Sequence, residues 1–182
     1  MIGSFLGDFI KGRLRDRFEP EIERGIRLHR AIDAFTDQHP QVTQAASRFR
    51  PPLRRYSAIL LDVLFDHLLA QSWSNYYHSE LEEFSRNILG LLVKNREKLP
   101  SQAQQMVIRM HQANSLASYG EVKYLEIAFA HLSQRLTRSN PISEALNPCL
   151  QLLPEIQEDF RRFYPELQLF CYNWQTSQQS DN

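Results

Sequence analysis

Residues 58–70 read A-I-L-L-D-V-L-F-D-H-L-L-A, an apolar stretch of helical character that only Asp62, Asp66 and His67 interrupt. Burial of one unpaired carboxylate costs several kcal/mol, so a hydrophobic helix with two carboxylates and an imidazole needs a compensating partner. A bound metal ion is one such partner. The stretch therefore predicts a hydrophobic helix that carries a candidate cation site.

A second charged stripe lies upstream, in G-I-R-L-H-R-A-I-D-A-F-T-D at 25–37. His29, Asp33 and Asp37 are each four residues apart, so they share one face of a helix. Two helices that each present carboxylate and imidazole together can converge on a single divalent cation.

These acids and histidines also have ordinary structural explanations. A His and an Asp one turn apart often form a simple salt bridge. Asp66 and His67 point about 100° apart around a helix, so both can bind one ion only if it lies between their two directions. Asp62 either ligates directly, orients a ligand or accepts a hydrogen bond from a nearby arginine. Asp8 is either an acid that satisfies helix donors or a carboxylate ligand.

The composition favours one all-α domain. The chain has 182 residues, of which 42% are hydrophobic, so it supports one substantial core. Stretches rich in Leu, Glu, Gln, Arg and Ala recur, whereas alternating β-branched runs are absent. We expect a single helical domain over 1–174, in which three prolines divide the last region into short helical pieces. The polar segment 175–182 is expected to be a disordered tail.

The helix boundaries follow from prolines and capping patterns. Pro20 suits a first helical position, and His39-Pro40 ends the same helix. Two Ser-x-x-Glu patterns, at 79–82 and 118–121, predict capping boxes. Aromatic residues such as Tyr119 are interpreted as packing groups. The expected helices are 20–37, 41–49, 53–77, 79–97, one that begins near Pro100-Ser101, and 118–138.

The charge balance argues against several classes of protein. The chain holds 21 basic and 21 acidic residues, which does not favour a nucleic-acid coat or a polybasic membrane anchor. No window is long and apolar enough for a membrane span, and the start does not resemble an export signal. Two distant cysteines, Cys149 and Cys171, suggest neither a disulfide framework nor a zinc knuckle. A reducing cytoplasm is the expected location.

Three motifs in combination resemble the acyl carrier protein phosphodiesterase family. They are G-S-F-L-G-D-F-I-K-G (3–12), G-I-R-L-H-R-A-I-D-A-F-T-D-Q-H-P (25–40) and L-D-V-L-F-D-H-L-L (61–69), and looser similarity continues to D-F-R-R-F-Y-P-E-L (159–167). The resemblance implies an all-helical bundle related to the HD phosphohydrolases. It also implies a divalent cation, often Mn²⁺, and hydrolytic removal of 4′-phosphopantetheine from holo acyl carrier protein.

The resemblance also implies roles for individual residues. Attack on phosphorus by a cation-activated water would use Asp66, His67 and His29, with Arg30 stabilising charge on the non-bridging oxygens. Oxygen and imidazole ligands without thiolate suit Mn²⁺, Mg²⁺ or Fe²⁺. By motif match, the implied ligands are Asp8, His29, Asp33, Asp66 and His67, with Asp62 and Asp37 as outer or alternate ligands.

Exposed arginines offer a docking surface. Most often such residues simply form a solvated surface, but the carrier protein of this family is acidic and would give them a partner. The predicted docking residues are Arg13, Arg15, Arg50, Arg54 and Arg55.

Two other interpretations remain open. The same metal site can serve a nucleotide or another phosphodiester, and a non-catalytic helical module can bind an acidic protein through its arginines. In the family pattern, a short segment resembling N-F-L-A-H precedes the G-x-x-L-x-D-F motif. Met1 stands almost at that motif here, so we expect one helix and one histidine of the pattern to be missing.

Overall fold

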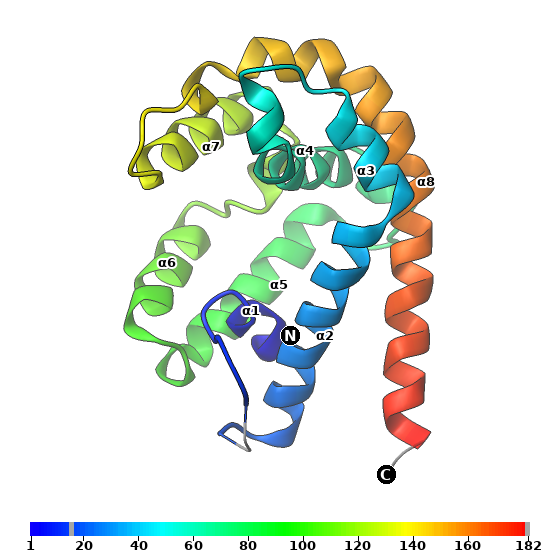
Figure 1. The fold of residues 1–182 in the computed structure, drawn as a ribbon. Helices are drawn as coiled ribbons and strands as arrows, with labels where there is room; N and C mark the ends of the chain where they lie inside the picture. Colours follow the sequence, from blue (N-terminus) through cyan, green and yellow to red (C-terminus); the bar gives the residue numbers. More distant parts are fainter. Residues whose placement is uncertain (15–16, 181–182) are drawn as a thin grey trace.

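A computed structural model describes residues 1–14 and 17–180, and every regular element within them is helical (Figure 1). The all-α prediction is confirmed. In the same residues, no helix has both the length and the apolar character needed to cross a membrane. The elements are α1 (Ile2–Leu6), α2 (Pro20–Gln38), α3 (Pro40–Ser47), η1 (Leu53–Tyr56), α4 (Ser57–Gln71), η2 (Trp73–Asn75), α5 (Leu81–Lys94), η3 (Arg96–Lys98), α6 (Ser101–Gln112), η4 (Ala117–Gly120), α7 (Val122–Arg135), η5 (Ile142–Glu144) and α8 (Leu146–Ser180).

The first hydrophobic cluster surrounds α4, in the upper part of Figure 1. Leu60, Leu64 and Leu68 recur every four residues along α4 and are almost completely buried. They share the cluster with Phe129 of α7 and Phe160 of α8. Burial of a leucine or phenylalanine side chain contributes about 1.5–3 kcal/mol. This burial holds α4 in place although the helix also carries two carboxylates.

The second cluster lies below the first and joins α1, α2, α5 and α6 (Figure 1). Leu6 and Ile26 are fully buried in it, beside Leu92 of α5 and Val107 of α6. α2 spans the distance between the two clusters, because Phe35 near its C-terminus packs against the cluster around α4. The acidic stripe of α2 therefore lies on the helix that links the two cores.

α1 crosses α2 in direct backbone contact. A Cβ atom on Gly3 would lie 2.1 Å from the carbonyl oxygen of Ile22, and one on Gly25 would lie 2.8 Å from Cα of Gly3. Real Cβ atoms do not approach so closely, so both positions require glycine for this crossing. The crossing places Gly7 and Asp8, which follow α1, over the middle of α2.

The C-terminal region corrects the sequence prediction. α8 is one helix of 35 residues, not a set of short pieces, and it continues to Ser180 where a disordered tail was expected from residue 175. Pro154 and Pro165 lie inside it, and each removes one helical hydrogen bond. Burial of residues such as Phe160 offsets that loss. Trp174 and Gln175 line a hollow with α2, so the start of the expected tail has a helical neighbour.

Other boundaries also differ from expectation. Both predicted capping boxes are wrong, because α5 and α7 each begin after a glutamate and neither N-terminus has a side-chain cap. The carbonyl of Ser79 instead accepts a hydrogen bond from Trp73 Nε1 at 2.6 Å. The helix predicted over 53–77 is divided into η1, α4 and η2. Its central part keeps the α-helical form that the candidate site needs.

Candidate functional site

Three of the predicted ligands meet around His29. Its Nε2 atom lies 3.3 Å from Oδ2 of Asp33, one turn further along α2, and 3.5 Å from Oδ1 of Asp8. Gly7 allows this approach, because a Cβ atom there would lie 2.2 Å from the His29 ring. The carboxylates of Asp8 and Asp33 are 74% and 58% exposed, so a ligand can reach them. We call Asp8, His29 and Asp33 the α2 group.

The acids of α4 lie within electrostatic range of the acidic stripe of α2. The pKa of Asp62 is raised, first by desolvation and then by the negative charges of Asp37, Asp33 and Asp8. The pKa of Asp66 is raised to about 7, mainly by desolvation and then by Asp62. Both residues keep accessible surface, so the desolvation comes from the protein atoms around them, not from full enclosure. The charges of the two stripes therefore interact, and their convergence on one cation stays a prediction.

His67 is fully buried, and its hydrogen bonds define its tautomer. Nδ1 lies 2.8 Å from the carbonyl oxygen of Tyr119, and a carbonyl only accepts, so Nδ1 carries the proton. Nε2 is buried without a hydrogen-bond partner. Burial also lowers the pKa of the imidazole, which favours the neutral ring. A neutral imidazole with one nitrogen bound to a carbonyl is the form in which histidine ligates metals. We call Asp62, Asp66 and His67 the α4 group.

Tyr119 was interpreted as a packing residue, but it belongs to the surroundings of the α4 group. Its ring stacks on that of Tyr124 with centroids 4.1 Å apart, and the two hydroxyls are hydrogen-bonded. Desolvation raises the pKa of both tyrosines, and the charge of Asp66 raises both further. Both hydroxyls thus keep their protons and can donate hydrogen bonds. No periodic pattern links Tyr119 to α4, and the only sequence signal for it is that it stands within the looser family similarity that continues to 159–167.

Arg30 holds the chain that follows α1. Its Nη2 atom donates a hydrogen bond to the carbonyl oxygen of Ile10 at 2.8 Å. This contact fixes the segment just after Asp8 and so supports the α2 group. The predicted role of Arg30 at a phosphoryl oxygen stays a prediction.

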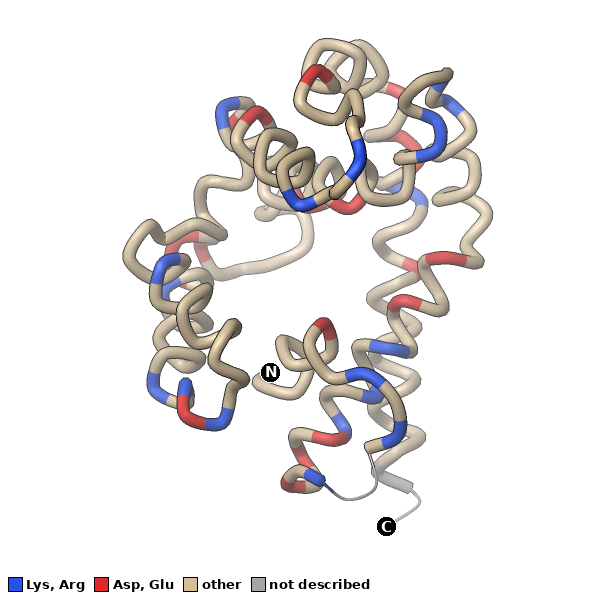
Figure 2. The backbone as a smooth tube through the Cα atoms, turned by 60° about the vertical axis from the view of Figure 1, so that its left-hand side comes forward, with Lys and Arg blue, Asp and Glu red and all other residues tan. Residues whose placement is uncertain are grey.

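The predicted docking arginines are accessible where the structure describes them. Arg13, Arg50, Arg54 and Arg55 are all exposed, and Arg55 lies over the ring of Tyr56 at 4.8 Å. Arg15 lies outside the described residues. Basic and acidic positions both occur in the upper and in the lower part of the molecule and do not separate into one region of each sign (Figure 2). Any carrier-protein surface is therefore local.

The residues suit a divalent cation in their chemistry. In the part of the chain that the structure describes, no three His, Cys, Asp or Glu side chains already form a metal-binding arrangement. The α4 group nevertheless has an unpartnered buried Nε2 and two mutually repelling carboxylates. A cation relieves both conditions, because it accepts the nitrogen lone pair and neutralises the acids.

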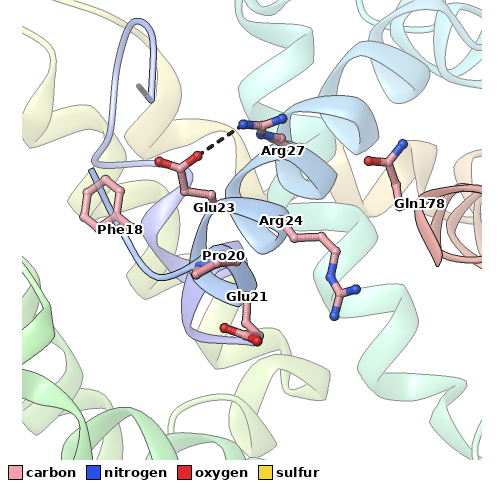
Figure 3. A pocket seen from close by; sticks show the side chains of 7 residues that line it. All are labelled: Phe18, Pro20, Glu21, Glu23, Arg24, Arg27 and Gln178. Carbon is pink, nitrogen blue, oxygen red and sulfur yellow. Dashed lines mark hydrogen bonds and ion pairs between the residues drawn. The ribbon is translucent and has the colours of Figure 1, made fainter. Parts of the chain in front are cut away.

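One open hollow, of about 470 Å³, lies away from both groups (Figure 3). It is formed by the N-terminal part of α2 and the end of α8. Arg27 pairs with the buried Glu23 at 3.1 Å, and Gln178 approaches from α8. None of the predicted ligands lines it, so it plays no part in the candidate site.

Comparison with known proteins identifies relatives over almost the whole chain. The model of the family described as acyl carrier protein phosphodiesterase matches residues 1–167. The acyl carrier protein phosphodiesterase of Pectobacterium atrosepticum is 29% identical over 92% of this chain and 87% of its own. The acyl carrier protein phosphodiesterase of Yersinia pestis is 27% identical over 92% of this chain and 87% of its own. That of Klebsiella pneumoniae strain 342 is 28% identical over 95% of this chain and 90% of its own. No solved structure matches, so the relationship to HD phosphohydrolases stays a prediction.

Proposed function

Because the chain belongs to the acyl carrier protein phosphodiesterase family, we propose that it hydrolyses the phosphodiester between 4′-phosphopantetheine and the serine of holo acyl carrier protein. The products would be the apo-carrier and free 4′-phosphopantetheine. The observation that carries this proposal is the placement of the α2 and α4 groups, whose acids lie close enough to shift the pKa of Asp62. A phosphodiester and a cation between them would bring the negative charges into balance.

The proposal includes a divalent cation, with Mn²⁺ preferred and Mg²⁺ or Fe²⁺ as alternatives. The α4 group and the carboxylates of Asp8 and Asp33 would hold it. When bound, the cation would lower the pKa of a water molecule and draw charge from the phosphoryl oxygens. Oxygen and nitrogen donors without thiolate fit such an ion.

The chain's own residues would orient the substrate and move protons. Water attacks phosphorus, the bond from phosphorus to the serine oxygen breaks, and the serine oxygen takes up a proton. Asp66 would help to hold the cation, and its pKa of about 7 applies to the chain without metal. The proton of the attacking water would pass to solvent. His29 Nε2, between two carboxylates, is placed to deliver a proton to the leaving oxygen. Arg30 and Tyr119 would donate hydrogen bonds to the non-bridging oxygens.

The protein substrate would dock through exposed arginines. An acidic carrier fits the predicted set around η1, namely Arg50, Arg54 and Arg55, together with Arg13. Pairs between exposed charges are weak and screened by salt, so docking should weaken as ionic strength rises. The reducing cytoplasm is the proposed setting for this encounter.

Intact-mass measurement of holo acyl carrier protein tests the proposal. With Mn²⁺, we expect the carrier to lose the mass of its phosphopantetheinyl group, and with chelator we expect no change. Asp66→Asn is the matched variant and should leave the carrier intact. Loss of mass in chelator would refute the cation, whereas an intact holo-carrier beside rapid cleavage of nucleotide diesters would assign the site to another substrate.

A further inference from the structure

We propose that a hollow at the C-terminal end of α4 binds the uncharged, amide-bearing arm of the substrate. The inference rests on the proposed function, because it assigns a place to the part of the substrate that leaves with the phosphate. The hollow has a volume of about 310 Å³ and is formed by the end of α4, η2, the start of α5 and η4. Its size falls within the range of small-molecule sites in proteins.

The position of the hollow connects it to the α4 group. Ala70 lines it and lies one turn after Asp66 on the same face of α4, about 6 Å along the helix axis. Gly120 lines it from η4 and directly follows Tyr119. The carbonyl of Gly120 accepts a hydrogen bond from Gln71 at 3.2 Å, which fastens η4 to α4 beside the opening. A ligand whose phosphate lies near Asp66 would extend into this hollow.

The lining suits a flexible chain without charge. Trp73 and Tyr77 stack with ring centroids 4.2 Å apart and contribute the aromatic part of a lining that is otherwise mostly polar. Ser74 and His78 add polar groups that can pair with amides of the ligand. Of the charged side chains that line the hollow, both are acidic, Glu80 and Glu82. They disfavour a phosphate or an acidic protein segment here and leave the phosphate to the cation site.

The hollows along α2 differ from the hollow at the end of α4 in the charge of their lining and in their position relative to α4. Those between α2 and α8 are lined by Glu21 and Arg24, so each combines both signs of charge. No residue of α4 or η4 contributes to either. The arm can be bound while the phosphate reacts only in a hollow that it reaches from Asp66. Of the hollows compared, only the one at the end of α4 is lined by a residue of that helix, Ala70.

Free pantetheine, which lacks the phosphate, is the probe for this hollow. Titration into the full chain at millimolar concentration, without metal, should shift the backbone amide signals of Ala70, Ala117 and Gly120 in ¹H–¹⁵N spectra. Ser74→Trp fills the hollow at an exposed position and should abolish the shifts. Gln175 lines a hollow between α2 and α8, so Gln175→Trp is the matched control and should keep the shifts. Shifts confined to α2 and α8, or no shifts, would overturn the inference.

Turnover separates this inference from the proposed function. Ser74→Trp should lower kcat/KM for holo acyl carrier protein about tenfold, because it removes binding of the arm. It should lower cleavage of bis(4-nitrophenyl) phosphate, a diester without the arm, by less than about twofold, because no arm has to bind. An equal loss on both substrates would count against an arm site. If the unmodified chain cleaves no holo-carrier, the proposed function fails, and the pantetheine titration still decides whether the hollow binds the arm.

Discussion

The α2 group and the α4 group contain the same kinds of side chain, yet the fold satisfies only one of them. In the α2 group, two accessible carboxylates surround Nε2 of His29. In the α4 group, Nε2 of His67 is buried without a partner, and Asp66 has a pKa raised to about 7. Unsatisfied buried polar atoms and shifted carboxylates concentrate at functional sites. The difference teaches that α4 is the half of the site that a ligand must complete.

Asp66→Asn should have the largest effect on turnover, because it changes the central carboxylate of the α4 group. The variant keeps the shape of the side chain but loses the negative charge that would hold the cation, so kcat/KM should fall about 1,000-fold. Cleavage of holo acyl carrier protein, followed by intact mass, measures the loss. Near neutral pH the native carboxyl is already partly protonated, so the variant should fold normally by circular dichroism. Retained turnover in a folded variant would show that the shifted carboxylate is not catalytic.

The same residue predicts a pH dependence of stability. The folded-state pKa of Asp66 lies above that of the unfolded chain, so the folded state binds more protons between about pH 4 and pH 7. Without metal, the native chain should therefore lose stability as pH rises through this window. Asp66→Asn should lack that loss, and urea unfolding in chelator at pH 5 and pH 8 compares the two.

His67→Asn and His67→Gln test the roles of the two imidazole nitrogens separately. Asn places an N–H near the position of Nδ1 and can keep the hydrogen bond to Tyr119, but it has no group at Nε2. We expect it to fold, to lose about 100-fold in kcat/KM, and to lose stabilisation by Mn²⁺. Gln reaches the position of Nε2 and should keep part of both properties, at a stability cost of about 1–3 kcal/mol.

Thermal unfolding with and without Mn²⁺ measures the stabilisation. At about 100 times its Kd, a cation stabilises the native chain by about 2.7 kcal/mol. If His67→Asn shows the same increase in Tm as the native protein, Nε2 is not a ligand. The α4 group would then differ from the α2 group only in its burial.

Gly7→Ala tests the α2 group through its packing. The backbone at Gly7 is helical, with φ −51°, so alanine causes no strain there, but its Cβ would lie 2.2 Å from the His29 ring. His29 must move and should lose its contact with Asp8, with about a tenfold loss in kcat/KM. Gly90→Ala is the control, since nothing lies within 4 Å of its Cβ, and it should only stabilise α5. Equal activity of the two variants would place the α2 group outside the reaction.

The local half of the site could be predicted from sequence. The four-residue spacing of His29, Asp33 and Asp37 and the apolar helix around Asp66 depend only on helical periodicity, and both helices are present. The proximity of Asp8 depends on a specific crossing. It needs glycine at the contact of α1 with α2 and again at Gly7, and such contacts leave no periodic pattern.

The remaining half depends on tertiary contacts. The carbonyl that fixes the tautomer of His67 belongs to Tyr119, 52 residues further along the chain. The continuity of α8 through Pro154 and Pro165 similarly depends on burial against distant helices, which outweighs local proline signals. Sequence reasoning found the residues with charge, but the groups that orient them come from elements it had interpreted as packing.

Asp62→Asn should have the smallest effect and addresses the boundary between the two groups. The pKa of Asp62 is raised by burial and by Asp37, Asp33 and Asp8, so its ionisation opposes folding when no cation is present. The variant should gain stability over the native chain as pH rises above about 4. The gain should stay below about 1 kcal/mol, since the side chain keeps contact with water. Urea unfolding in chelator at pH 5 and pH 8 measures it.

Asp33→Asn is the matched variant, because it also removes a negative charge near Asp62 but loses a contact with His29. If the repulsion between α2 and α4 is real, both variants should flatten the pH dependence, and Asp62→Asn alone should raise stability at pH 8. Added salt should reduce the effect, because these accessible charges are screened. A pH-independent difference between Asp62→Asn and the native chain would mean that the two acidic stripes do not interact. The cation would then have no shared charge to neutralise, and the α4 group would have to hold it alone.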